Sequence, residues 1–278
     1  MDVKQILTQY GFRFNKQFGQ NFLTDKQLLS EIVSDAGVNG GTVLEIGAGA
    51  GTLTRALAQK ADRVIAYEID RNLEQVLAIT LADCPNVQVV IGDVTKRKIA
   101  DLDETCGNNY RVVANIPYYL TTPLITSFVE ESRNVTSLTL TIQKEVADRL
   151  NAVPSTKDYG ALTVGVQAVA DVTLTRTLSR KLFYPEPNVD SAVVRIDMNR
   201  NKFDISNRKL FRKTVRAAFA MRRKTLVNNL MTGFNLDRTS AEAVVSKCGL
   251  PVGCRGEELS VQQFVALYKA IESNTTTD

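Results

Sequence analysis

The chain has 278 residues, 44% of them hydrophobic and 23% charged, which is typical of a globular protein with one large domain and a smaller one. It contains no histidine, and none of its four cysteines forms a C-x-x-C pair, which argues against a zinc site and histidine-dependent hydrolysis. No apolar run approaches the roughly 20 residues of a membrane span, and no signal peptide is recognised, so we expect a cytoplasmic protein. The net charge of +4 is concentrated in residues 190–278, which carry +6.

The first expected elements surround a glycine-rich loop. Thr24 and Gln27 form a capping-box pattern that predicts a helix through about residue 33. The apolar run Val43–Ile46 then predicts a buried strand, which is followed by a G-x-G-x-G loop at residues 47–51 and a helical pattern. Such a strand, loop and helix is typical of the opening of a nucleotide-binding α/β unit.

Strands and helices alternate after this loop. Apolar stretches predict a helix at residues 144–150 and strands at residues 63–67, 87–91, 111–114 and 138–142. This alternation indicates a mostly parallel sheet with helices on both faces. Two further strands, at residues 168–174 and 192–196, are expected to form an antiparallel hairpin at one edge of the sheet.

The last part of the chain changes to helical periodicity. One helical stretch is predicted at residues 207–230, and capping-box patterns that begin at Thr239 and Ser260 precede further helices. We therefore expect a catalytic domain at residues 1–198 and a small all-helical domain at residues 199–278.

Polar side chains follow three successive strands. Glu68 stands 19 residues beyond Gly49, where a carboxylate in an α/β fold holds ribose hydroxyls. Asp93 follows the next strand and could accept from the amino group of adenine, although an acid there can also be only a turn cap. The segment Asn115–Tyr118, which reads N-I-P-Y, offers an amide acceptor and a flat ring that could hold a planar base with an amino group.

Four motifs in this order resemble one known family. They are Phe18–Leu23 (F-G-Q-N-F-L), the glycine loop, Asn115–Tyr118 and Phe183–Ser191 (F-Y-P-E-P-N-V-D-S). Over residues 18–268 the chain resembles the ribosomal RNA adenine N6,N6-dimethyltransferases of the KsgA (RsmA) type. The resemblance implies a Rossmann-like class I methyltransferase sheet, mostly parallel with an antiparallel edge hairpin, and a small helical C-terminal domain. It also implies S-adenosylmethionine as the cofactor.

The resemblance implies a specific reaction and partner. N6 would be dimethylated on two adjacent adenines in the 3′-terminal hairpin loop of small-subunit ribosomal RNA. The substrate would be an immature 30S particle, and the chain would act as a monomer without a membrane or a metal.

Site residues are carried over onto matching positions. The implied cofactor contacts, with Glu68 on the ribose and Asp93 on the adenine amino group, are Gln20, Asn21, Leu23, Gly47, Gly49, Glu68, Ile69, Asp93, Val94 and Asn115. The implied catalytic residues, with the target adenine between the rings of Tyr118 and Phe183, are Asn115, Ile116, Pro117, Tyr118 and Phe183. The attacked nitrogen would lose its proton to water, so a site without histidine suffices.

The basic C-terminal stretch supplies the expected RNA contacts. Residues 195–224 contain 11 Lys and Arg against two Asp, and the cations recur at helical spacing. The shortage of interleaved acids favours a face that contacts phosphates over an ordinary solvated helix face. The candidates are Arg208, Arg212, Arg216, Arg222, Arg223 and Lys224.

Three alternatives remain open. An Erm-type methyltransferase shares the fold and pocket but modifies large-subunit RNA and gives antibiotic resistance. An NAD-linked oxidoreductase is suggested by the loop and Glu68, although Thr52 stands where its fingerprint has a third glycine. The third is a catalytically silent RNA-binding assembly factor, against which the presence of Asn115 and Tyr118 argues.

Overall fold

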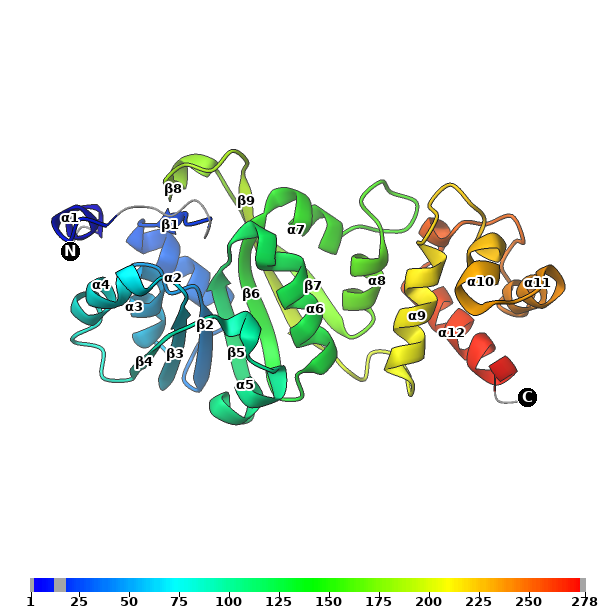
Figure 1. The fold of residues 1–278 in the computed structure, drawn as a ribbon, viewed down its shortest axis with the longest axis horizontal. Coiled ribbons are helices and arrows are strands. Elements are labelled where there is room, and N and C mark those ends of the chain that lie inside the picture. The colour runs from blue at the N-terminus through cyan, green and yellow to red at the C-terminus, as the bar shows by residue number, and fades with distance from the viewer. Residues whose placement is uncertain (1–2, 13–18, 276–278) are drawn as a thin grey trace. The chain divides into compact units, whose positions relative to one another are not determined.

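The computed structural model describes residues 3–12 and 19–275 (Figure 1). Phe18, the first residue of one sequence motif, lies outside the described residues. Contacts divide the chain into two compact units. The first comprises the chain up to Ala147 together with Val172–Met198, and the second comprises Asp148–Asp171 and the chain from Asn199. The sequence predicts one boundary, after residue 198. In the structure, Asp148–Asp171 also groups with the helical unit, although it precedes that boundary.

A seven-stranded sheet forms the centre of the first unit in the described part of the chain, in the order β4-β3-β2-β5-β6-β9-β7. Its strands are β2 (Thr42–Ile46), β3 (Arg63–Glu68), β4 (Val87–Ile91), β5 (Tyr110–Asn115), β6 (Val135–Gln143), β7 (Ala170–Leu178) and β9 (Ser191–Met198). The strands from β2 to β6 pair in parallel, and β9 pairs with β6 antiparallel. The predicted mixed sheet, with β9 and β7 at one edge, is confirmed.

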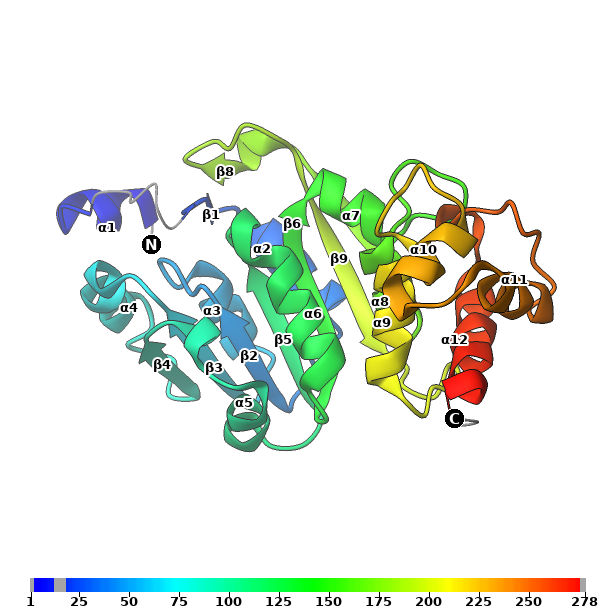
Figure 2. The same ribbon diagram turned by 45° about the vertical axis from the view of Figure 1, so that its right-hand side comes forward.

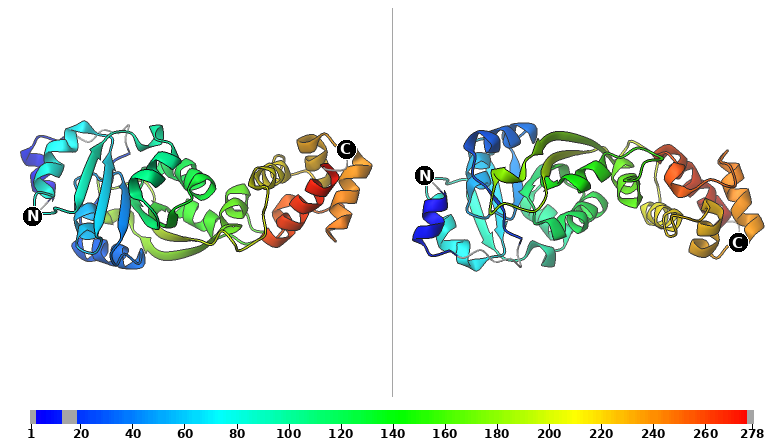
Figure 3. Two further views of the ribbon diagram at one scale, coloured as in Figure 1. Left: turned by 90° about the horizontal axis from the view of Figure 1, so that it is seen from below. Right: turned by 90° about the horizontal axis from the view of Figure 1, so that it is seen from above.

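Helices cover both faces of this sheet. Figure 3 shows α2 and α3 on one face and α5 and α6 on the other. The helices associated with the sheet are α1 (Val3–Gln9), α2 (Lys26–Asp35), α3 (Thr52–Ala58), α4 (Glu74–Thr80), α5 (Ile99–Cys106), α6 (Thr121–Glu131) and α7 (Lys144–Leu150). A separate two-stranded sheet pairs β1 (Phe22–Leu23) with β8 (Phe183–Tyr184), two segments far apart in sequence (Figure 2).

The sheet core is apolar because its central strands are covered on both faces. Val43 and Leu44 on β2 are fully buried, as are Val64 and Ile65 on β3. Helix α2 begins one residue later than the sequence pattern predicted. The N-cap is Asp25 and not Thr24, because the Asp25 carboxylate accepts hydrogen bonds from the backbone N–H groups of Gln27 and Leu28.

The second unit is mainly helical. It contains α8 (Ala161–Gln167), α9 (Arg208–Ala218), α10 (Leu226–Phe234), α11 (Arg238–Lys247) and α12 (Val261–Thr275). The segment before α8 packs here because the Tyr159 hydroxyl donates to the carbonyl of Leu259 at 2.7 Å and Ser155 N–H donates to the carbonyl of Glu257 at 2.8 Å.

The predicted single helix over residues 207–230 is wrong, because α9 ends at Ala218 and α10 begins at Leu226. The buried Asn229 side chain donates to the carbonyls of Ala218 and Met221, which holds the turn between the two helices. Thr225 caps the start of α10 by accepting from Asn228 N–H.

The two remaining cap predictions had different outcomes. Asp237, and not Thr239, caps α11 by accepting from Ser240 N–H. Ser260 and Gln263 do form a capping box at the start of α12, because each backbone N–H donates to the other's side chain. No helix in the described residues has the length and apolar character that crossing a membrane requires.

Candidate active site

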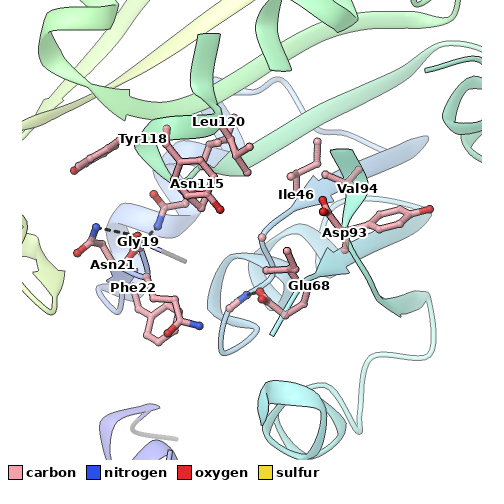
Figure 4. A pocket seen from close by; sticks show the side chains of 18 of the residues that line it. Gly19, Asn21, Phe22, Ile46, Glu68, Asp93, Val94, Asn115, Tyr118 and Leu120 are labelled. Carbon is pink, nitrogen blue, oxygen red and sulfur yellow. Dashed lines mark hydrogen bonds between the residues drawn. The ribbon is translucent and has the colours of Figure 1, made fainter. Parts of the chain in front are cut away.

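Most of the predicted cofactor and substrate residues meet at the carboxyl ends of β2 to β5. These strands are parallel, so the loops that follow them lie at one edge of the sheet, where α/β proteins bind ligands. One pocket at this edge (Figure 4) is lined by the predicted residues Gln20, Asn21, Gly47, Gly49, Glu68, Ile69, Asp93, Val94, Asn115, Ile116, Pro117 and Tyr118.

The pocket also has a lining that the sequence analysis did not select. These residues are Gly19, Phe22, Ile46, Tyr67, Gly92, Tyr119 and Leu120. Each stands within two positions of a predicted residue, so its closeness in the sequence to that residue could have indicated it as a candidate. Spacing alone does not say which neighbour faces the pocket, because that depends on the backbone conformation of each loop.

Two predicted residues do not line this pocket. Leu23 lines a smaller adjoining hollow, which it shares with Gly47 and Asn115. Phe183 is 5% exposed and pairs with Leu23 across the two-stranded sheet, outside the pocket lining. Its contact with a target base stays a prediction.

Backbone hydrogen bonds hold the glycine loop against β3. The N–H groups of Gly47 and Ala48 donate to the carbonyl of Tyr67 at 2.9 and 3.0 Å, and Gly49 N–H donates to Glu68 Oε2 at 2.7 Å. Gly47 and Gly49 have φ values of 80° and 58°, in the left-handed region that side chains other than glycine rarely adopt. The sequence G-x-G thus allows the chain to turn directly after β2 and leaves backbone exposed to the pocket.

Glu68 is a buried carboxylate at the wall of the pocket. It is 5% exposed, and Oε1 accepts a hydrogen bond from Asp70 N–H at 2.8 Å. Burial raises the pKa of Glu68, and the hydrogen bonds from Asp70 and Gly49 oppose this rise. Each carboxylate oxygen accepts one of these bonds and has the capacity to accept another. Two neighbouring hydroxyls could therefore donate to it.

Asp93 combines the two roles considered for it. Its Oδ1 accepts from Thr95 N–H at 2.9 Å and from Thr95 Oγ1 at 2.6 Å, which caps the 3₁₀ turn Val94–Lys96. No hydrogen bond to Oδ2 is found within the described ranges, so this oxygen remains available to an amino group. Capping and ligand binding use different oxygens of the same carboxylate.

Asn115 is oriented by the segment before β1. Its Nδ2 donates to the carbonyl of Asn21 at 2.7 Å, and Asn21 Nδ2 donates to the carbonyl of Gly19 at 3.2 Å (Figure 4). These bonds fix which end of the Asn115 amide is the donor. The Oδ1 atom is therefore left as a hydrogen-bond acceptor at the pocket.

The Tyr118 side chain is held by a contact with β9. Its hydroxyl shares a hydrogen bond of 2.9 Å with Ser191, the first residue of β9. Burial raises the pKa of the Tyr118 phenol, Ser191 opposes the rise, and the charge of Asp190 adds to it. The hydroxyl is therefore protonated at neutral pH, so Tyr118 can supply a ring face but does not act as a base.

The candidate RNA contacts all lie in the second unit. Arg208, Arg212 and Arg216 lie on α9 as expected. Arg222, Arg223 and Lys224 are in the turn before α10 and not on a helix, so the inferred helical spacing is wrong for them. Arg222 is held by Glu257, with Nε 2.6 Å from Oε2, whereas the side chains of Arg223 and Lys224 are exposed.

Comparisons with known proteins agree over nearly the whole chain. A family model described as ribosomal RNA adenine dimethylase matches residues 11–273. Ribosomal RNA small subunit methyltransferase A of Clostridioides difficile is 41% identical and covers 99% of this chain and 96% of its own length. Its namesake in Alkaliphilus oremlandii is 42% identical and covers 95% of this chain and 94% of its own.

Two solved structures share the fold and most of the chain. A dimethyladenosine transferase from Plasmodium falciparum has a TM-score of 0.78 at 26% identity and covers 92% of this chain and 98% of its own. The 23S rRNA methyltransferase ErmE has a TM-score of 0.71 at 26% identity and covers 91% of this chain and 100% of its own. The family model and the relatives above 40% identity place the chain in the ribosomal RNA adenine dimethylase family.

Proposed function

We propose that the protein dimethylates N6 of two adjacent adenines in the 3′-terminal hairpin loop of small-subunit ribosomal RNA, within an immature 30S particle. The observation that carries this proposal is the Asn115 amide, which is held so that Oδ1 is an acceptor in the pocket that Tyr118 also lines. The relatives named small subunit methyltransferase A support the choice of RNA. Such a substrate implies action in the cytoplasm, and we propose that the chain acts as a monomer.

The pocket suits S-adenosylmethionine as the cofactor. A side-chain atom on Gly47 would lie 3.6 Å from the carbonyl oxygen of Asn115, so the glycine keeps the space between these two loops open. Buried Glu68 suits two ribose hydroxyls, and Asp93 Oδ2 suits the amino group of adenine. When bound, the cofactor supplies a methyl group on a positively charged sulfur.

The protein's own residues orient the target amine. The Asn115 Oδ1 acceptor can bind one N6 hydrogen, which directs the nitrogen lone pair away from the amide and restricts its orientation. The ring of Tyr118 can stack on the base, a contact worth about 1–3 kcal/mol per base, which offsets the cost of unstacking it. Because the Tyr118 hydroxyl stays protonated, we assign the departing proton to water.

The helical unit is proposed to hold the RNA backbone. Arg223 and Lys224 are exposed in the turn before α10, and Arg208, Arg212 and Arg216 follow one another at four-residue intervals on α9. Phosphate contacts from such side chains give affinity without reading sequence. The selection of two particular adenines is therefore assigned to the pocket and to the shape of the RNA.

The alternatives receive less support. The Erm-type structure is 26% identical, whereas the small-subunit relatives are 41–42% identical. The family match also favours a methyltransferase over an NAD-linked oxidoreductase. Labelled methyl transfer to immature small subunits and to naked large-subunit RNA distinguishes the proposed small-subunit enzyme from an Erm-type enzyme. Modification of only the large-subunit RNA would overturn the proposal.

Asn115→Ala tests the catalytic assignment. We expect methyl transfer to fall by at least about 100-fold, because a positioned amine can owe several kcal/mol of its reactivity to alignment. RNA affinity should be nearly unchanged, since the phosphate contacts are elsewhere. The measurements are single-turnover methyl transfer and filter binding of the RNA, and full activity in this variant would refute the role of Asn115. Asn108→Ala, at an exposed turn position outside the pocket, is the control.

A further inference from the structure

Two consecutive tyrosines in the 3₁₀ turn Tyr118–Leu120 have different surroundings. Both line the pocket. The Tyr118 hydroxyl is anchored to buried Ser191 on β9. Tyr119 is 56% exposed, more than any other large hydrophobic side chain in the described pocket lining. More than half of the Tyr119 side chain is therefore open to solvent and could be covered by a ligand in the pocket.

Tyr119 lies near the residues assigned to the nucleoside of the cofactor. A side-chain atom built on Gly19 would lie 4.0 Å from Cε1 of Tyr119, so the ring is close to the segment before β1. Partial burial raises the pKa of the Tyr119 phenol, and the negative charges of Asp93 and then Glu68 add to the rise. Both carboxylates therefore act on the Tyr119 hydroxyl, whereas Asp190 is the charged group that acts on Tyr118.

No hydrogen bond of the Tyr119 hydroxyl is found within residues 3–12 and 19–275. Tyr118, in contrast, has both a buried partner and half-buried surroundings. A ring that is exposed and without a hydrogen bond can change rotamer at little cost, because no buried polar group loses its partner.

We propose that Tyr119 binds the cofactor by closing its ring over the nucleoside between Gly19 and Asp93, while Tyr118 serves the target adenine. The inference rests on the proposed function and assigns a ligand to each tyrosine. Closure would remove apolar ring surface from water and give the nucleoside an aromatic contact. Reopening of the ring would let the demethylated cofactor leave. This release is needed because two methyl transfers consume two cofactor molecules, one after the other.

Titration calorimetry of the full-length protein with S-adenosylhomocysteine tests this division without requiring activity. Tyr119→Ala should raise the dissociation constant at least about fivefold, the lower end expected for loss of one aromatic stack. Tyr119→Phe keeps the ring and should remain within about twofold of the wild type. Tyr10→Ala is the matched control, because Tyr10 is also an exposed tyrosine of the first unit but does not line this pocket.

Tyr118→Ala provides the complementary measurement. It should bind S-adenosylhomocysteine with nearly unchanged affinity and lose most methyl transfer, because its ring is assigned to the base. Thermal unfolding followed by circular dichroism checks that every variant is folded at the titration temperature. If Tyr118→Ala weakened cofactor binding as much as Tyr119→Ala, the division between the tyrosines would be wrong.

Tyrosine fluorescence adds a direct signal, because the chain has eight tyrosines and no tryptophan. S-adenosylhomocysteine should change the emission of the wild type more than that of Tyr119→Phe. Unchanged cofactor affinity in Tyr119→Ala would overturn the inference. Absence of binding by the wild-type protein would instead overturn the proposed function on which the inference rests.

Discussion

Glu45 is the most deeply buried acid beside the site. It lies on β2 directly before the glycine loop, is 1% exposed, and neither carboxyl oxygen has a hydrogen-bond partner among the described residues. Burial raises the pKa of Glu45 to about 8, the nearby Thr54 hydroxyl opposes this rise, and the charge of Glu68 adds to it. The folded protein therefore keeps Glu45 protonated at neutral pH.

This pKa predicts a pH-dependent stability. Below a pH of about 4.5, the ordinary pKa of the carboxyl in the unfolded chain, Glu45 is protonated in both the folded and the unfolded state and does not change the stability. As the pH rises from there towards about 8, only the unfolded chain loses this proton, so the folded state loses stability. Glu45→Gln removes this loss. The free energy of unfolding of the variant relative to the wild type should rise by up to about 1.4 kcal/mol per pH unit across this window. Urea unfolding at pH 5, 6.5 and 8 measures it, and parallel pH curves would contradict the buried-acid interpretation.

Among the elements, the loop between β2 and α3 depends most on glycine. A side-chain atom on Gly49 would lie 2.8 Å from Cε1 of Phe22, and the φ value of 58° is itself unfavourable for other residues. The Gly49 N–H also donates to Glu68. Close packing, backbone conformation and hydrogen bonding therefore meet at one position of this loop.

Gly49→Ala should destabilise the fold by about 1–3 kcal/mol and weaken S-adenosylhomocysteine binding more than tenfold, because the loop and Phe22 must both move. Gly107→Ala is the control that separates the effect of the backbone conformation from the effect of the close contact with Phe22. Gly107 has a φ value of 78°, but an added side-chain atom would meet nothing within 4 Å. The control should lose about 1–3 kcal/mol of stability, because its φ and ψ of 78° and −163° lie in a region that glycine almost alone adopts, and it should keep its affinity for the ligand. Equal ligand affinity in both variants would remove the role of this close contact.

At the scale of the whole molecule, the proposed function separates chemistry from RNA affinity. The pocket is built within the first unit, and the basic turn before α10 belongs to the second. Arg222 is partly neutralised by Glu257, so Arg223 and Lys224 are the better phosphate ligands in this turn.

The double variant Arg223→Ala/Lys224→Ala should bind RNA more weakly and lower the slope of log affinity against log salt by about 1.5, the release expected from two phosphates. Arg238→Ala/Lys247→Ala removes the same charge from α11 of the same unit and is the control. Affinity measured between 50 and 200 mM salt, roughly the range over which such slopes are resolved, decides the outcome. An unchanged slope in the first variant would exclude the turn from the RNA contact.

The sequence was sufficient where one short segment determines a structure. The strand before the glycine loop, the capping box of Ser260 and the acids at strand ends were predictable, because apolar periodicity, cap residues and parallel strand direction are local signals. The four sequence motifs also indicate the family. Local signals failed at Thr24 and Thr239, where a neighbouring aspartate is the better cap.

Only the tertiary structure decided which side chains share a pocket and which are held elsewhere. Asn115 and Asn21 are 94 residues apart, and their hydrogen bond forms because the segment before β1 returns to the end of β5. Folding also places Phe183 opposite Leu23 and outside the pocket lining, whereas Tyr119 lines it. The sequence by itself determined the family, the order of the elements and the chemistry available. Burial and long-range hydrogen bonds, which depend on contacts between distant segments, decided how each group is oriented.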